Sequence, residues 1–146
     1  MLIENRKASF NYEFLEKFEA GIELFGHEVK SLRKKQGSLE GSHVVVRGGE
    51  AFLLNAYIPP YQSKNTPAGY DERRARRLLL TKRELHGLAS AESKKGLTVV
   101  PILVYNKGRK LKVSLAIARG KKKFDKREAI RKRDAERDIR REMNAR

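Results

Sequence analysis

Cysteine is absent from this chain of 146 residues. The protein therefore has no disulfide framework, no thiolate zinc site and no thiol nucleophile, which suits a reducing compartment. Long apolar runs are also missing, since none approaches the roughly 18 residues that a membrane-spanning helix requires. The amino terminus, Met1-Leu-Ile-Glu-Asn-Arg-Lys, is short and interrupted by charge. We expect a soluble, cytoplasmic protein that is not exported and does not bind membranes.

Motifs of catalysis and cofactor binding are missing as well. The chain contains no Gly-x-x-x-x-Gly-Lys-Ser/Thr or Gly-x-Gly-x-x-Gly phosphate loop and no Gly-x-Ser-x-Gly nucleophile turn. Three histidines, His27, His43 and His86, lack partners at the spacing of metal ligands and are read as ordinary surface or partly buried residues. The sequence predicts no enzyme, no cofactor and no metal site.

Basic residues dominate what is present, with 34 Lys or Arg against 18 Asp or Glu and a net charge of +16. Residues 120–146 hold 12 basic and 6 acidic residues, so residues 1–119 keep 22 and 12. The large apolar side chains of that last stretch are only Phe124, Ile130, Ile139 and Met143. We predict one domain over 1–119 and a basic tail over 120–146 that is disordered when free. A polyanion is the expected partner.

Hydrophobic periodicity predicts mostly strands, at residues 18–24, 43–47, 51–58, 76–80, 97–105 and 111–118. A short helix is expected over 28–35, closed by Gly37, and a second one follows the capping box Thr81-Lys-Arg-Glu84. Gly48-Gly49 and Asn106-Lys-Gly-Arg read as hairpin turns, and Pro101 as an edge or a bulge. About six strands with two or three short helices indicate a mainly β fold, a small antiparallel β-barrel of the oligonucleotide-binding type.

The basic side chains gather in four bunches: Lys30, Arg33, Lys34, Lys35; Arg73, Arg74, Arg76, Arg77; Lys107, Arg109, Lys110, Lys112; and Lys121, Lys122, Lys123. Taken singly, about half of them are expected to be solvated surface charges. Together they favour phosphate contact, in which arginines bind bidentately and lysines act as point charges. This mixture suits recognition of a folded RNA by its shape.

Two other residues have competing interpretations. Glu28 is either an acid stabilised by the amino end of its helix or an acceptor that faces RNA, and the sequence does not decide between them. Leu79 should point away from Leu78 and Leu80, because successive strand residues face opposite sides. A contact of Leu79 beneath a helix is favoured slightly over a contact with a base.

Four segments resemble, in order and spacing, the motifs of the small protein B (SmpB) family, the tmRNA-binding proteins of bacterial trans-translation. They are Gly26-His-Glu-Val-Lys-Ser-Leu-Arg33, Ala56-Tyr-Ile-Pro-Pro-Tyr61, Arg76-Arg-Leu-Leu-Leu80 and Gly120-Lys-Lys-Lys-Phe-Asp-Lys-Arg127. The resemblance runs from about residue 5 to residue 127. It departs from the family at Asp71-Glu72-Arg73-Arg74, where relatives often read Asp-Pro-x-Arg, and at Arg77, which is commonly Lys.

The resemblance implies a barrel that binds the tRNA-like domain of tmRNA, with elongation factor Tu on the same complex. It also implies a tail that enters the vacant mRNA channel and decoding centre of a stalled 70S ribosome. Acid-to-base pairs at i and i+4, such as Glu128 with Lys132, predict that the tail becomes helical there. With the basic bunches, the expected RNA-binding residues are Glu28, Lys30, Arg33, Arg74, Arg76, Arg77, Leu79 and Lys112. The expected ribosome-binding residues are Gly120, Lys121, Lys122, Phe124, Asp125, Lys126 and Arg127, with the Phe124 ring able to stack on a base. A monomer is expected.

Two other functions fit the charge. A general ribosomal or RNA-chaperone barrel would explain it, but would not require the four segments in this order. Binding to an anionic membrane surface would need an amphipathic apolar stripe, and Ile130, Ile139 and Met143 give only a thin one. Enrichment of tmRNA on purification would support the first interpretation, and broad binding of rRNA or lipid would support the others.

Overall fold

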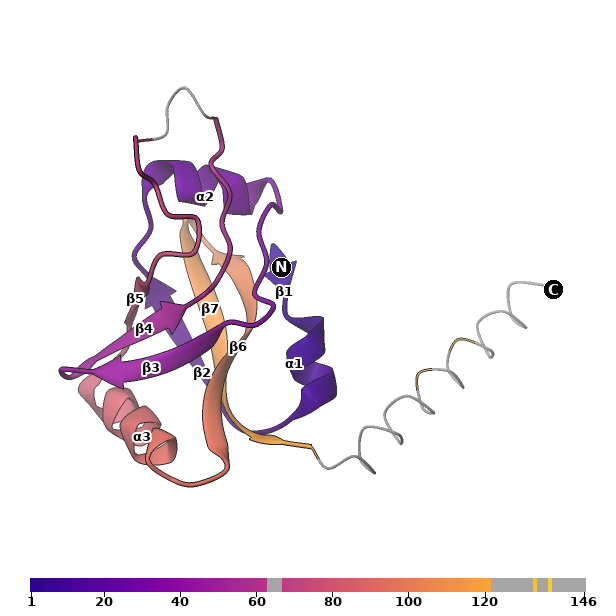
Figure 1. Ribbon diagram of the computed structural model, residues 1–146, viewed down its shortest axis with the longest axis vertical. Coiled ribbons are helices and arrows are strands. Elements are labelled where there is room, and N and C mark those ends of the chain that lie inside the picture. Colours follow the sequence, from indigo (N-terminus) through magenta and orange to yellow (C-terminus); the bar gives the residue numbers. More distant parts are fainter. Residues whose placement is uncertain (63–66, 122–132, 134–136, 138–146) are drawn as a thin grey trace.

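The strands form one antiparallel sheet that closes on itself (Figure 1). A computed structural model describes residues 1–62 and 67–121 together with residues 133 and 137. In this part of the chain the elements are β1 (Ile3–Glu4), α1 (Arg6–Asn11), β2 (Tyr12–Ile22), α2 (Gly26–Arg33), β3 (His43–Arg47), β4 (Glu50–Leu54), β5 (Arg76–Leu79), α3 (Lys82–Glu92), β6 (Leu97–Lys107) and β7 (Lys110–Gly120). The predicted mainly β class is confirmed.

The strand order is β1-β6-β3-β4-β5-β2-β7, and a further pairing between β6 and β7 closes the ring. Each of these pairings is antiparallel. The ring itself therefore uses the six strands from β2 to β7, while β1 adds to β6. Buried side chains inside this ring-like sheet form the core, and Leu32 of α2 and Leu88 of α3 join it with no exposed surface.

Local sequence signals explain several turns and helix ends. Gly48 and Gly49 have φ angles of 60° and 75°, the left-handed conformation that a tight turn between β3 and β4 requires. The predicted capping box is also present. The Thr81 N–H donates to Glu84 Oε1 at 3.0 Å, and the Glu84 N–H donates to Thr81 Oγ1 at 3.2 Å. The pairing of β6 with β7 shifts register between Pro101 and Leu103, so the predicted bulge is confirmed.

Several predicted boundaries are wrong. The helix expected over 28–35 spans Gly26–Arg33, and Lys35, with a φ of 60°, takes the left-handed turn that we assigned to Gly37. Position 37 requires glycine for a different reason, because a Cβ there would lie 2.9 Å from the Tyr57 carbonyl oxygen. β4 ends at Leu54 because Asn55 has a φ of 64° and turns the chain away from the sheet. The turn between β6 and β7 is only Gly108 and Arg109.

The amino-terminal elements were not predicted. β1 has only two residues, and α1 is one short helix capped by Asn5, whose Oδ1 accepts from the Ala8 N–H at 3.2 Å. β2 begins at Tyr12 rather than at residue 18, because its first half pairs with the end of β7. Both features depend on strands about 100 residues away in the sequence, as the pair Ile3 and Val104 shows.

The last strand extends past the expected boundary at Arg119. Gly120 still pairs with Tyr12, and the Lys121 N–H donates to the Asn11 carbonyl at 2.8 Å. The Lys121 ammonium also donates to the Ser9 carbonyl at 3.1 Å. The folded body therefore includes Lys121. None of the three helices in the described residues has the length and the hydropathy that crossing a lipid bilayer requires.

Candidate nucleic-acid interface

A hollow of about 330 Å³ opens on the surface between α2, β2, β5 and the turn from β6 to β7. Its wall is apolar where Ile22, Leu24, Val29, Leu79 and Leu111 line it, and basic where Arg33, Arg109, Lys110 and Lys112 do. Arg33 Nη2 donates to the Arg109 carbonyl at 2.8 Å, which ties α2 to the turn. Three predicted RNA-binding residues, Arg33, Leu79 and Lys112, thus come together here.

Leu79 projects into this hollow because of its place in β5. Burial alternates along the strand, so that Arg76 and Leu78 face inward while Arg77 and Leu79 face outward. Leu79 is 46% exposed, and therefore the slightly favoured interpretation, a contact beneath a helix, is wrong. Gly21 of β2 is its register partner, and a Cβ on Gly21 would lie 3.2 Å from the Leu79 Cβ. Because Gly21 has no side chain, the Leu79 side chain can lie close against the backbone of β2.

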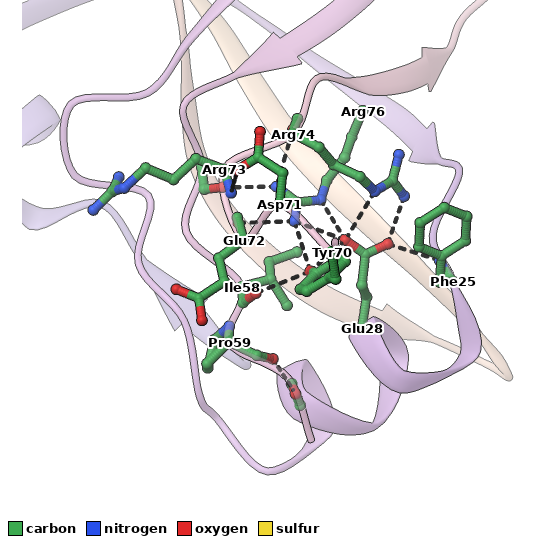
Figure 2. Close-up of polar contacts among 12 residues, drawn as sticks. Phe25, Glu28, Ile58, Pro59, Tyr70, Asp71, Glu72, Arg73, Arg74 and Arg76 are labelled. Carbon is green, nitrogen blue, oxygen red and sulfur yellow. Dashed lines mark hydrogen bonds and ion pairs between the residues drawn. The ribbon is translucent and has the colours of Figure 1, made fainter. Parts of the chain in front are cut away.

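Glu28 is at the centre of a buried cluster that joins α2 to the segment before β5 (Figure 2). Its Oε1 accepts from the Phe25 N–H at 2.8 Å and from Arg74 Nη2 at 2.5 Å. Its Oε2 accepts from Arg76 Nε at 2.8 Å and from the Tyr70 hydroxyl at 2.8 Å. Both Glu28 and Arg76 have fully buried side chains. A carboxylate with this many donors is compensated for its loss of water.

Arg76 donates its remaining hydrogens to backbone carbonyls and to the Tyr70 hydroxyl. Its Nη1 donates to the Ala56 carbonyl at 2.7 Å, and its Nη2 donates to the Glu72 carbonyl at 3.0 Å and to the Tyr70 hydroxyl at 3.1 Å. The predictions that Arg76 contacts RNA phosphate and that Glu28 faces RNA are therefore wrong as direct contacts, because both side chains are 0% exposed. The pair instead holds the loop that carries Arg73 and Arg74 against α2.

The cluster changes the acidity of two of its members. Burial by itself raises the pKa of Glu28, but hydrogen bonds from Arg74, from the Phe25 backbone and from Arg76 outweigh it and lower the pKa to about 2. Burial, together with the adjacent Glu28 carboxylate, raises the pKa of the Tyr70 hydroxyl to about 12. Glu28 is therefore ionised and Tyr70 is a neutral donor throughout the physiological range.

Acid should weaken this cluster in a defined pH range. The folded pKa of Glu28, about 2, lies below its ordinary value of 4.5, so the stabilisation is complete above pH 4.5 and is lost as pH falls towards 2. A shift of this size corresponds to about 3 kcal/mol. We expect the difference in unfolding free energy between the natural chain and Glu28→Gln, measured by urea titration, to shrink below pH 4.5. A difference that stays constant down to pH 2.5 would contradict this assignment.

Basic groups in and around the cluster alternate with aromatic rings. The guanidinium carbon of Arg74 lies 4.0 Å from the centroid of the Phe25 ring, and that of Arg73 lies 5.2 Å from the centroid of Tyr57. The Lys30 ammonium lies 5.9 Å from the centroid of Tyr61. Interleaved cations and rings are typical of surfaces that bind single-stranded or irregular RNA.

The remaining predicted cations lie near the hollow. Arg77 is exposed, follows the same face of β5 as Leu79, and pairs with Glu23 and Glu50 at 3.1 Å each. Lys30 is one helical turn before Arg33 on α2, so the two share a face. Surface ion pairs such as those of Arg77 are worth about 0–1 kcal/mol, and a phosphate can therefore displace them.

The structure describes only two of the predicted ribosome-binding residues of the tail. Gly120 and Lys121 belong to the folded body, as described above. Lys122, Phe124, Asp125, Lys126 and Arg127 lie outside the described residues. Within the described part of the chain, no group of three or more His, Asp and Glu is placed to bind a metal ion.

Sequence reasoning missed three residues of this surface, Gly21, Phe25 and Tyr70. Gly21 interrupts an alternating strand, which is a known sign of close approach by another group. Phe25 is a large apolar residue directly before a helix, where a polar cap is usual. Tyr70 lies in a loop and carried no comparable signal.

Comparison with known proteins decides the family. The sequence model described as SmpB protein matches residues 2–145, which is nearly the whole chain. The chain belongs to the SmpB family. Relatives in this family include an SsrA-binding protein of Gloeothece citriformis, 45% identical over 98% of this chain and 92% of its own length. Another SsrA-binding protein, from Parvibaculum lavamentivorans, is 52% identical over 94% of this chain and 84% of its own length.

A solved structure extends the SmpB likeness to three dimensions. A chain described by the words "tmRNA-SmpB: a journey to the center of the bacterial ribosome" is 46% identical and superposes with a TM-score of 0.70. The match covers 88% of this chain and 94% of the other. The ring-like sheet described above is thus the SmpB fold.

Proposed function

We propose that this protein binds the tRNA-like domain of tmRNA and acts in trans-translation on stalled ribosomes. The observation that carries the proposal is the convergence of Arg33, Leu79 and Lys112, which are far apart in the sequence, on one solvent-open hollow. The SsrA-binding relatives and the tmRNA-SmpB structure point to the same ligand. The role is one of binding, and no reaction is assigned to the protein.

The hollow combines two kinds of contact. Leu79 offers a half-exposed apolar side chain that can cover a ribose or the face of a base, while Arg33 and Lys112 offer positive charge to the phosphates beside it. Lys30, Arg74 and Arg77 extend the positive charge over the neighbouring surface. Glu28 and Arg76 act indirectly, because they fix the loop and α2 at the spacing that this surface needs.

The tail is proposed to act on the ribosome, where it enters the empty mRNA channel and reaches the decoding centre. Its sequence holds acid-to-base pairs at i and i+4, such as Glu128 with Lys132 and Glu136 with Arg140, which favour a helix once rRNA neutralises the excess charge. In this proposal the Phe124 ring stacks on a base of the decoding centre. Elongation factor Tu on the same tmRNA complex, a cytoplasmic location and a monomeric state complete this proposal.

A general RNA-binding role is the competing function, because the net charge of +16 alone would attract any RNA. A gel-shift titration with the tRNA-like domain, in the presence of an unrelated folded RNA of equal length, separates the two. We expect the competitor to displace the tRNA-like domain only at large excess. Displacement of the tRNA-like domain by an equal concentration of the unrelated RNA would show that the protein binds RNA without this preference.

The folded body alone should retain this RNA binding. Truncation after Lys121 keeps β7 and its contacts with Asn11, and it removes only the tail. We expect the affinity for the tRNA-like domain at moderate salt to change by less than about threefold, since the hollow lies entirely within residues 1–121. Loss of binding in the same gel-shift assay would mean that the tail anchors the RNA.

The salt dependence of binding should report on Arg77 and not on Arg47. Each neutralised phosphate contributes about 0.7–0.9 to the slope of log K against log salt. Arg77→Gln should lower that slope by about one. Arg47 is a matched control, because it is also an exposed strand arginine paired with glutamate, Glu92, at 2.6 Å. Arg76, the neighbour of Arg77, is buried and cannot contribute to the slope. Equal slopes in both variants would place Arg77 away from the RNA.

A further inference from the structure

The residue at the amino end of α2 is an aromatic ring where a polar cap would normally stand. Phe25 is the N-cap of the helix, with extended backbone angles of −73° and 157°, and it is 49% exposed. Serine, threonine, aspartate or asparagine is preferred at this position because its oxygen accepts from a free backbone N–H of the first turn. A phenylalanine cannot accept such a bond, and it leaves apolar surface in water.

The start of the helix is secured without the Phe25 ring. Glu28 Oε1 accepts from the Phe25 N–H at 2.8 Å, so the acidic half of a capping box is supplied by the third helical residue. Leu24 and Val29 both pack against the core, and they occupy the two positions of a hydrophobic staple, just before the cap and at the fourth helical residue. The backbone contacts here would be available to almost any residue at position 25.

The ring is nevertheless held in one orientation. The guanidinium carbon of Arg74 lies 4.0 Å from the ring centroid, and Arg74 is itself fixed by its ion pair with buried Glu28 at 2.5 Å. The His27 ring lies 5.7 Å away, and it packs edge-on against Tyr70 with centroids 4.5 Å apart. The cation takes one face of the ring, and 49% of Phe25 remains exposed to solvent.

We propose that Phe25, supported by Arg74, stacks on an unpaired base of the RNA that occupies the neighbouring hollow. The inference rests on the proposed function and extends its binding surface. Phe25 directly follows Leu24, which lines the hollow, and the Phe25 carbonyl accepts from the N–H of Val29, another lining residue. Unpaired bases of folded RNA stack on aromatic rings and on guanidinium planes, and this pair provides both.

The first test separates the aromatic face from apolar bulk. Loss of one base-stacking contact weakens binding by about 5- to 150-fold. Phe25→Leu should therefore bind the tRNA-like domain at least about fivefold more weakly, while Phe25→Tyr stays within about twofold of the natural chain. The melting temperatures of the three proteins should differ by only a few degrees, since the ring is half exposed and the helix start is secured without it. Leucine binding as tightly as phenylalanine would overturn the inference.

A second test reports on stacking directly and does not depend on the affinities. The chain has no tryptophan, so Phe25→Trp introduces a single tryptophan, whose emission can be excited selectively over that of the tyrosines. Leu15→Trp is the matched control, because Leu15 is 44% exposed and six residues before Gly21 on β2, about 20 Å from the hollow. We expect the tRNA-like domain to quench the fluorescence at position 25 and not at position 15. Equal quenching, or none at either position, would overturn the inference.

The outcomes also separate this inference from the function on which it rests. If the natural chain does not prefer the tRNA-like domain over the unrelated RNA, the proposed function fails and the stacking role fails with it. If the preference holds while Phe25→Leu binds normally and Phe25→Trp is not quenched, only the stacking role is wrong. Melting curves of each variant guard against a loss of binding that is caused by unfolding.

Discussion

Glu28→Gln is expected to lower the unfolding free energy by about 3–5 kcal/mol, the usual cost of removing one partner from a buried ion pair. The neutral amide would leave the Arg76 guanidinium fully buried without its counter-charge and would weaken the bonds from Arg74 and Tyr70. Domains of this size are stable by only about 5–15 kcal/mol, so the loss is a large share of the total. Urea unfolding at 25 °C and neutral pH measures it.

Two further variants make this expectation specific. Glu23→Gln removes the exposed partner of Arg77, at 3.1 Å, and should cost less than about 1 kcal/mol. Combining Glu28→Gln with Arg76→Met removes the buried charge as well as its partner, so the double variant should be more stable than Glu28→Gln alone. Equal costs for Glu23→Gln and Glu28→Gln would show that the cluster is not a stabilising element.

Replacement of Asp125, Lys126 and Arg127 by alanine should leave tmRNA binding within about twofold of normal, because the proposed RNA surface lies within residues 1–121. The same change should reduce the tagging of stalled chains by roughly 100-fold. Two charge-assisted contacts to rRNA, each worth about 1.5 kcal/mol or more, would be lost. The readouts are a gel shift for binding and an in vitro translation assay on non-stop mRNA for tagging.

A control with the same change in charge tests whether position matters. Arg137, Asp138 and Arg141 can be replaced by alanine in the same way, further along the tail and outside its acid-to-base pairs at i and i+4. We expect a smaller loss of tagging from this variant, since its groups lie outside the segment 120–127 that is expected to bind the ribosome. Equal losses would mean that net charge alone explains the tail's effect, and normal tagging in both variants would remove the tail from the proposed mechanism.

Local signals predicted local structure well. The Gly48-Gly49 turn and the Thr81 and Glu84 capping box need only neighbours within four residues, and both are present. Contacts between distant segments could not be read in this way. β1 is a strand only because Ile3 and Glu4 reach β6, and two residues carry no periodicity of their own.

The candidate site was predictable to the extent that strand alternation applies. Alternation correctly set Leu79 apart from Leu78, but whether a helix or solvent lies over it depends on how α2 packs. Charge counting failed for Arg76, since a bunch of arginines does not show which member is buried. The burial of Arg76 could have been predicted from strand alternation, because Arg76 is two residues before Leu78 and therefore shares its inward face.

The two ends of β7, at Lys112 and at Gly120, serve different parts of the proposed function. Lys112 lines the hollow beside α2, whereas Gly120 pairs with Tyr12 beside α1, where the tail begins (Figure 1). Eight residues of extended strand separate them by about 27 Å. Because β7 is paired along both edges, with β2 and β6, this separation is rigid. In the proposed function, the rigid body therefore fixes the distance between the RNA that it binds and the ribosomal channel that its tail enters.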